Sequence, residues 1–144
     1  MRAVSVLSAG AWAASREAGH IVADFEQRFR RRFRFTTAEG WAFLLDLAQP
    51  VRLRDGDGLV LEDGRIVRVA ALAESLAEIT AFDDRGITRI AWHLGNRHLP
   101  VQMMRHTLRI RAEPTAIDLV ERLGGRVELL RAAFDPEPGA YEPH

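Results

Sequence analysis

The second half of the chain alternates between helix-like and strand-like spacing of its apolar residues, and this alternation limits the folds open to it. From Ile87 to Leu94 apolar residues recur at i, i+3, i+4 and i+7, which is one face of a helix, and Gly95 is the expected helix stop. Pro114 opens a second helical run, because proline fits the first turn of a helix. Strand-like runs lie around these two helices, at residues 75–82, 99–104, 108–111 and 126–133. The order β-α-β-β-α-β predicts a ferredoxin-like domain.

The first half of the chain carries only strand signals. Residues 28–35 alternate between two faces, of which one carries phenylalanines and the other carries Arg28, Arg30, Arg32 and Arg34. A second apolar run covers residues 41–47 and closes at residues 49–50. Asp63 and Gly64 predict the turn of a hairpin between two further short strands.

We therefore predict an α+β chain with two domains and a tail. Residues 1–72 form an N-terminal small antiparallel β domain, and residues 73–134 form a C-terminal ferredoxin-like βαββαβ domain. Residues 135–144 are rich in proline and glycine, which is typical of an extended, mobile tail.

The composition excludes several kinds of chemistry. The chain has no cysteine, which excludes thiol nucleophiles, disulfides and cysteine-ligated metal sites. All 20 basic residues are arginine, which excludes a P-loop or Schiff-base lysine. The formal net charge of +0 gives no general attraction to nucleic acid or to an anionic membrane. No apolar run reaches the roughly 18 residues of a transmembrane helix, and none resembles a signal peptide, so we expect a cytoplasmic protein.

No catalytic motif is present, and we predict that the chain is not an enzyme. The serines lie outside any Gly-x-Ser-x-Gly pattern, and there is no His-Glu-x-x-His pair. The arginines of residues 28–34 are better explained as a solvated strand face than as a nucleic-acid patch. Residues 55–58 predict a turn and not a calcium loop, because Ile66 stands where an EF-hand needs glutamate.

His98 is the main candidate for a functional residue. It follows the expected helix end, where a neutral imidazole could donate its lone pair to a metal. A surface histidine, or one that caps the helix, fits this position equally well. Imidazole suits Ni(II), Zn(II) or Cu(II), but a tight site needs about three or four protein ligands. In a two-fold dimer a residue near the axis appears twice, so two copies of His98 could face one ion.

The other histidines have weaker cases. His144, in the tail, could add a ligand, although most chain ends have no such role. His93 borders the apolar face of the first helix and is most simply a packed or partly exposed helical residue. His106 is most simply a turn residue, and His20 a loop residue that precedes a strand.

One motif resembles the signature of a known family: it runs from Trp92 to Gln102 and contains Gly95-Asn96-Arg97-His98. The family is urease accessory protein E, the nickel metallochaperone of the urease system. Other segments also resemble it, namely residues 53–64 (its N-terminal β domain), 119–124 (its second helix) and 134–141 (its closing segment).

This resemblance implies a homodimer whose ferredoxin-like domains meet. Both protomers would contribute His98 to one interfacial Ni(II) site, with His144 as a further ligand, and Zn(II) or Cu(II) could occupy it in vitro. It also implies an N-terminal domain that binds a peptide or partner, and delivery of Ni(II) to apo-urease with the help of the accessory GTPase.

The chain departs from the family in two places. Its tail holds only His144, where many members have a histidine-rich tail, and residues 109–114 lack a His-x-His pair that some members carry. An alternative of another class also stands, a metal-independent dimeric adaptor. In that case the first domain binds a partner and the second only dimerises.

Overall fold

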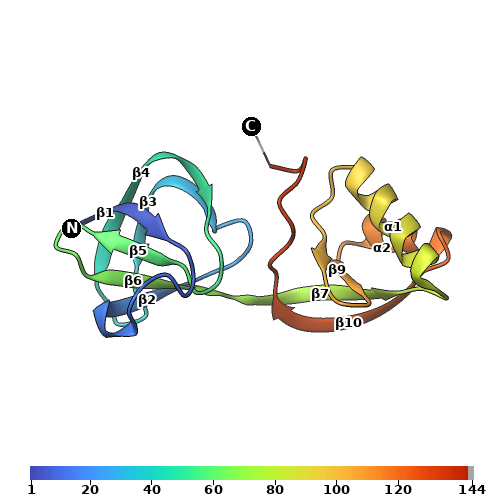
Figure 1. The fold of residues 1–144 in the computed structure, drawn as a ribbon, viewed down its shortest axis with the longest axis horizontal. Coiled ribbons are helices and arrows are strands. Elements are labelled where there is room, and N and C mark those ends of the chain that lie inside the picture. The colour runs from blue at the N-terminus through green and yellow to red at the C-terminus, as the bar shows by residue number, and fades with distance from the viewer. Residues whose placement is uncertain (143–144) are drawn as a thin grey trace. The chain divides into compact units, whose positions relative to one another are not determined.

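The computed structural model describes residues 1–142, and the chain divides into two compact units (Figure 1). The first unit is Met1–Leu72 and the second is Ala73–His144. Within the described residues, no helix has the length and apolar character needed to cross a membrane.

The first unit is built on a six-stranded sheet with the strand order β2-β6-β5-β1-β4-β3. Its strands and its short 3-10 helix are β1 (Arg2–Leu7), η1 (Ala14–Arg16), β2 (Glu17–Ala23), β3 (Phe29–Thr36), β4 (Ala42–Arg52), β5 (Gly58–Leu61) and β6 (Ile66–Ala71). Inward-facing residues such as Leu45, Leu59 and Val67 are fully buried and form one hydrophobic core. The sheet therefore has its own core and does not depend on the second unit for one.

This sheet is mixed, so the prediction of an antiparallel domain was wrong in this respect. β1 pairs with β4 in parallel, and β2 pairs with β6 in parallel, whereas the other neighbours are antiparallel. The hairpin turn at Asp63 and Gly64 is confirmed. Strands joined by a tight turn must be antiparallel, but β1 and β2 reach their parallel partners through long stretches of chain.

β4 is longer than the sequence predicts. It continues past residues 49–50 to Arg52, because Pro50 lies in an irregular stretch of the β3–β4 pair. The register passes from Arg30 opposite Val51 to Arg32 opposite Asp46. A bulged stretch tolerates the missing N–H of proline, so the strand is bent there and not ended.

Arg28 does not lie on a solvated face, as its place in the alternation predicts. It precedes β3 and is fully buried, and its guanidinium donates a hydrogen bond to the carbonyl of Leu53 at 3.2 Å. A buried arginine needs such partners, so this residue has a structural role in the first unit.

The second unit has the element order β-α-β-β-α-β. Its elements are β7 (Ala73–Thr80), α1 (Asp84–Asn96), β8 (Gln102–Met103), β9 (Leu108–Arg111), α2 (Pro114–Arg122) and β10 (Arg126–Ala133). The strand order is β10-β7-β9-β8, and all neighbours are antiparallel. The predicted helices and strands of this half are confirmed, except that the predicted strand over residues 99–104 is only two residues long.

Both helices of the second unit lie on the same side of its sheet (Figure 1). Ile90 and Leu94 from α1 and Val120 from α2 pack with Ile79 and Ile110 from the sheet, and all five are buried. The apolar spacing of both helices therefore faces one core, and this core holds the C-terminal end of α1 in place.

Candidate metal centre

The C-terminal end of α1 has a hydrogen-bond pattern that fixes the backbone of His98. The N–H of His98 donates to the carbonyl of Gly95 at 3.0 Å, and the N–H of Leu99 donates to the carbonyl of Leu94 at 3.1 Å. Together these bonds form a Schellman motif, in which one residue is left-handed and is usually glycine. Here that residue is His98, with φ of 59°, and no other non-glycine residue within 1–142 has a positive φ.

Gly95 is therefore not the helix stop that the sequence predicts. It lies inside α1, which extends to Asn96, and a Cβ atom at this glycine would meet nothing within 4 Å. Leu94 is buried and Leu99 packs against the same core cluster, which is the apolar contact typical of the motif. This pair of leucines sets the helix end and puts the left-handed position on His98.

The backbone conformation of His98 is strained, and its ring nitrogens have no bonding partner within residues 1–142. A left-handed residue other than glycine costs about 1–2 kcal/mol. The side chain is exposed, and neither ring nitrogen forms a hydrogen bond or ion pair within the described part of the chain. The interpretation as a capping histidine is therefore not supported, because the ring does not bond the helix carbonyls, whereas the alternative of a surface histidine agrees with the exposed side chain. Strain of this kind is often found at functional sites.

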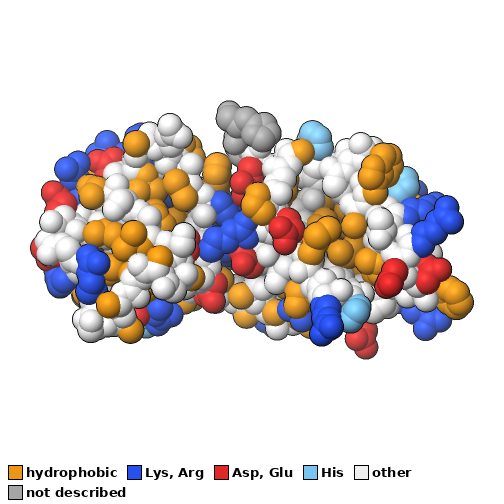
Figure 2. Space-filling view, in the orientation of Figure 1, with side chains coloured by type: hydrophobic (Ala, Val, Ile, Leu, Met, Phe, Trp, Pro, Cys, Tyr) orange, Lys and Arg blue, Asp and Glu red, His pale blue; other side chains and the backbone are white. Residues whose placement is uncertain are grey.

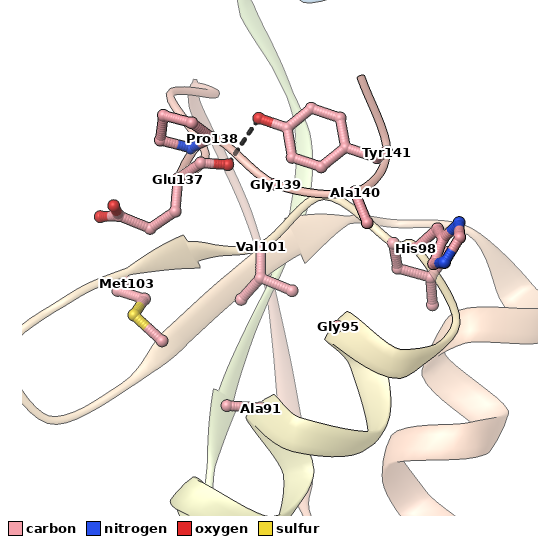
Figure 3. Close-up of a pocket in the computed structure, with 11 residues that line it drawn as sticks. Ala91, Gly95, His98, Val101, Met103, Glu137, Pro138, Gly139, Ala140 and Tyr141 are labelled. Atoms are coloured by element: carbon pink, nitrogen blue, oxygen red, sulfur yellow. Dashed lines mark hydrogen bonds between the residues drawn. The ribbon is translucent and has the colours of Figure 1, made fainter. Parts of the chain in front are cut away.

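His98 lines a mostly apolar hollow of about 140 Å³ within the second unit. The hollow is lined by Ala91 and Gly95 of α1, by Val101 and Met103, and by residues 137–141 of the closing segment. Figure 3 shows the imidazole at one end of the hollow, turned away from Val101 and Met103. The ring is thus placed at the rim, where a ligand can approach from solvent.

The closing segment of the chain contacts the second unit beside His98, whereas the sequence predicts a mobile tail from residue 135. Phe134 is fully buried, and the N–H of Glu137 donates to the carbonyl of Val101 at 2.9 Å. The hydroxyl of Tyr141 donates to the carbonyl of Glu137 at 2.6 Å (Figure 3). His144, the second predicted ligand, lies outside the described residues.

The other histidines of the second unit do not join His98. His93 is half-buried on α1 and meets Trp92 edge-to-face, with 5.1 Å between ring centroids. His106 is exposed in the bend between β8 and β9, as predicted. The histidines visible in Figure 2 lie apart from one another, and within residues 1–142 no three His, Asp or Glu side chains gather to hold a metal ion. The described part of one chain therefore has no complete metal site.

The candidate groups of the first unit have structural partners. His20 lies in β2, and not in a loop as predicted, and its Nδ1 is 2.8 Å from a carboxylate oxygen of Glu39. The other oxygen of Glu39 accepts the N–H of His20 at 2.9 Å, and this bond lowers the pKa of the Glu39 carboxyl. In the predicted turn over residues 55–58, which is confirmed, Asp57 accepts the N–H groups of Ala9 and Arg54 at 3.1 and 2.8 Å.

Two family models match the chain, one for each unit. Residues 3–72 match the N-terminal domain of UreE urease accessory protein, and residues 74–144 match its C-terminal domain. The chain is 50% identical over 141 residues to the urease accessory protein UreE of Bradyrhizobium sp. strain BTAi1, which covers 98% of this chain and 68% of that protein. The identity to the protein of the same name in Rhodopseudomonas palustris strain BisB18 is 49% over 143 residues, or 99% of this chain and 67% of that protein. The protein of the same name in Rhodobacter capsulatus is 42% identical over 140 residues, or 97% of this chain and 86% of that protein.

Proposed function

Because the chain belongs to the UreE urease accessory protein family, we propose that it binds Ni(II) and delivers it for maturation of the urease active site. The family consists of accessory proteins and not of enzymes, which confirms the prediction that the chain is not a catalyst. In this function the nickel ion is cargo, bound and then released, and not a resident cofactor.

The observation that carries this proposal is the exposed imidazole of His98, held on a left-handed backbone with no partner for its ring nitrogens within residues 1–142. Neutral imidazole is a good ligand for nickel, and also for zinc and copper, so the residue type alone does not select the metal. A site with few protein ligands at the surface suits release of the ion better than a closed four-ligand cage does.

We also propose that two copies of the chain complete the site. Tight metal sites need about three or four protein ligands, and the described part of one chain brings no three candidate side chains together. A two-fold dimer would supply His98 twice. His144 is proposed as a further ligand because the chain is long enough to bring it to His98. Tyr141 lines the same hollow as His98. His144 follows Tyr141 by three residues, which span at most about 10 Å.

The domain roles are part of the same proposal. The strand order β10-β7-β9-β8 and the element order β-α-β-β-α-β support a ferredoxin-like second unit, which we propose as the dimerising and metal-binding domain. The first unit is proposed to bind a peptide or protein partner, with the accessory GTPase and apo-urease as the partners of the whole protein. A cytoplasmic location stays a prediction.

Calorimetric titration with Ni(II) tests the metal site. We expect the wild-type chain to bind one ion per two chains, and the His98→Ala variant to lose this site. His93→Ala is the matched control, because His93 is on the same helix but outside the hollow. Unchanged affinity and stoichiometry in His98→Ala would refute the proposal. Capture of the accessory GTPase with and without Ni(II) tests the adaptor alternative, which predicts no effect of the metal.

A further inference from the structure

Strand β3 forms one edge of the six-stranded sheet in the first unit. It stands at the end of the strand order and pairs only with β4. The segment after β3 turns back to β2, where the N–H of Ala38 donates to the carbonyl of His20 at 2.8 Å. Along Phe29–Thr36 itself, no other strand of the described residues lies on the outer side. An edge of this kind presents backbone N–H and C=O groups that can pair with an added strand.

The β3 edge carries unpaired positive charge. Arg31, Arg32 and Arg34 are exposed, and none of them forms an ion pair or a hydrogen bond within residues 1–142. Arg2, on the same sheet, differs because its guanidinium lies 3.0 Å from the carboxylate of Asp46. In a chain with a formal net charge of +0, three neighbouring guanidinium groups without partners form a local excess of positive charge.

One aromatic residue, Phe33, lies between Arg32 and Arg34 along the strand, with its side chain on the opposite face. Phe33 is 38% exposed, and the guanidinium of Arg30 lies 4.3 Å from its ring centroid. On the other side the ring packs edge-to-face on the buried Phe35. The edge therefore offers an apolar ring beside Arg30 on one face of the strand, and the side chains of Arg32 and Arg34 on the opposite face.

The charge of this edge selects its partner. Two copies of β3 would bring like charges together, which disfavours pairing of the edge with itself. An acidic strand meets no such repulsion, and its carboxylates can form charge-assisted hydrogen bonds with arginine. The backbone groups of an edge strand favour a polypeptide over a nucleic acid, because only a polypeptide can continue the hydrogen-bonded sheet.

We propose that the β3 edge binds an extended acidic segment of a protein partner, which adds as a further strand of the sheet. Carboxylates two residues apart would face Arg32 and Arg34, and an apolar side chain between them would meet Phe33 on the opposite face. This inference rests on the proposed function only for the kind of partner, a protein of the urease maturation machinery, and not for the chemistry of binding.

Fluorescence anisotropy with the full chain tests this inference. The probe is a fluorescein-labelled eight-residue peptide of alternating glutamate and valine, and the variant carries Arg32→Ser and Arg34→Ser. The control variant carries Arg85→Ser and Arg89→Ser, two exposed arginines of α1 that also lack partners within the described residues. Both variants change the net charge equally, and circular dichroism verifies that each is folded.

We expect the β3 variant to bind the peptide at least about tenfold more weakly than the wild type, and the α1 variant to bind it as the wild type does. A peptide with N-methyl groups on alternate amides should bind as weakly as the β3 variant does, because it cannot complete the strand pairing. Equal loss in both variants, undiminished binding of the methylated peptide, or tighter binding of single-stranded oligothymidylate would each overturn the inference. Ni(II) titration of the β3 variant separates this result from the proposed function, since its metal binding should be unchanged.

Discussion

Replacement of His98 by glycine separates the strain of the helix end from the proposed metal site. Glycine adopts the left-handed conformation without a steric cost, whereas alanine keeps the strain because it has a Cβ atom. Both variants lack the imidazole. His98→Gly and His98→Ala therefore differ in backbone conformational energy, and neither should bind Ni(II) as the wild type does.

The difference in stability follows from two opposing effects. Release of the left-handed strain at φ of 59° favours glycine by about 1–2 kcal/mol. The greater conformational entropy of glycine in the unfolded chain opposes this by about 0.5–1 kcal/mol. Taking the middle of each range, we expect His98→Gly to be more stable than His98→Ala by about 0.75 kcal/mol, which raises the unfolding midpoint of a unit of this size by roughly 3–6 °C.

Thermal and urea unfolding, followed by circular dichroism in the presence of a chelator, measure this difference without metal-linked stabilisation. The same two variants are then titrated with Ni(II) after removal of the chelator. A glycine variant less stable than the alanine variant would show that the backbone strain at His98 is absent, because only the entropic cost of glycine would then remain. Wild-type nickel affinity in either variant would show that the imidazole is not a ligand.

Three further changes test other parts of the fold. The N–H of His20 lowers the pKa of the Glu39 carboxyl, so the stability gained from this carboxylate is present at neutral pH and is lost as pH falls through the folded-state pKa. In urea unfolding, the stabilities of the wild type and Glu39→Gln should therefore converge below pH 4.5. A difference that stays constant with pH would contradict this. In Gly125→Ala the new Cβ would lie 2.6 Å from a methyl carbon of Val120. We therefore expect the free energy of unfolding, measured in urea, to fall by about 1–3 kcal/mol. An unchanged urea midpoint would show that the core adapts. Phe134→Ala should lower the free energy of unfolding by about 3–5 kcal/mol, because it removes a buried ring, and should speed amide hydrogen exchange in the closing segment. Exchange as slow as in the wild type would show that the ring does not anchor this segment.

The second unit was predictable because its helices show their buried face directly in the sequence. Ile90 and Leu94 lie four residues apart and both enter the core, and Pro114 marks the start of the second helix. Pairing in the first unit was less predictable. The partners of β1 and β2 are chosen by packing between segments far apart in the chain, and a local alternation carries no information on whether such a pair is parallel.

At the candidate site, the assignment of His98 as a metal ligand stays a prediction, and the sequence did not predict its left-handed backbone. Gly95 is the stronger local signal for a helix end, and it predicts the wrong position, because the left-handed residue is His98. The five-residue spacing of Leu94 and Leu99 is the signal that could have found it, because these two side chains make the apolar contact of a Schellman motif. The proposed completion of the site by a second copy would depend on surfaces between chains, which residue spacing along one chain does not encode.

The end of α1 also bears on how fast a ligand can exchange. Its hydrogen bonds belong to the backbone, and the ring of His98 takes part in none of them within residues 1–142. A ligand that binds this ring therefore displaces solvent and breaks no bond of the fold. Arrival and departure need no local unfolding, so their rates are set by substitution chemistry at the ligand and not by the opening of the protein.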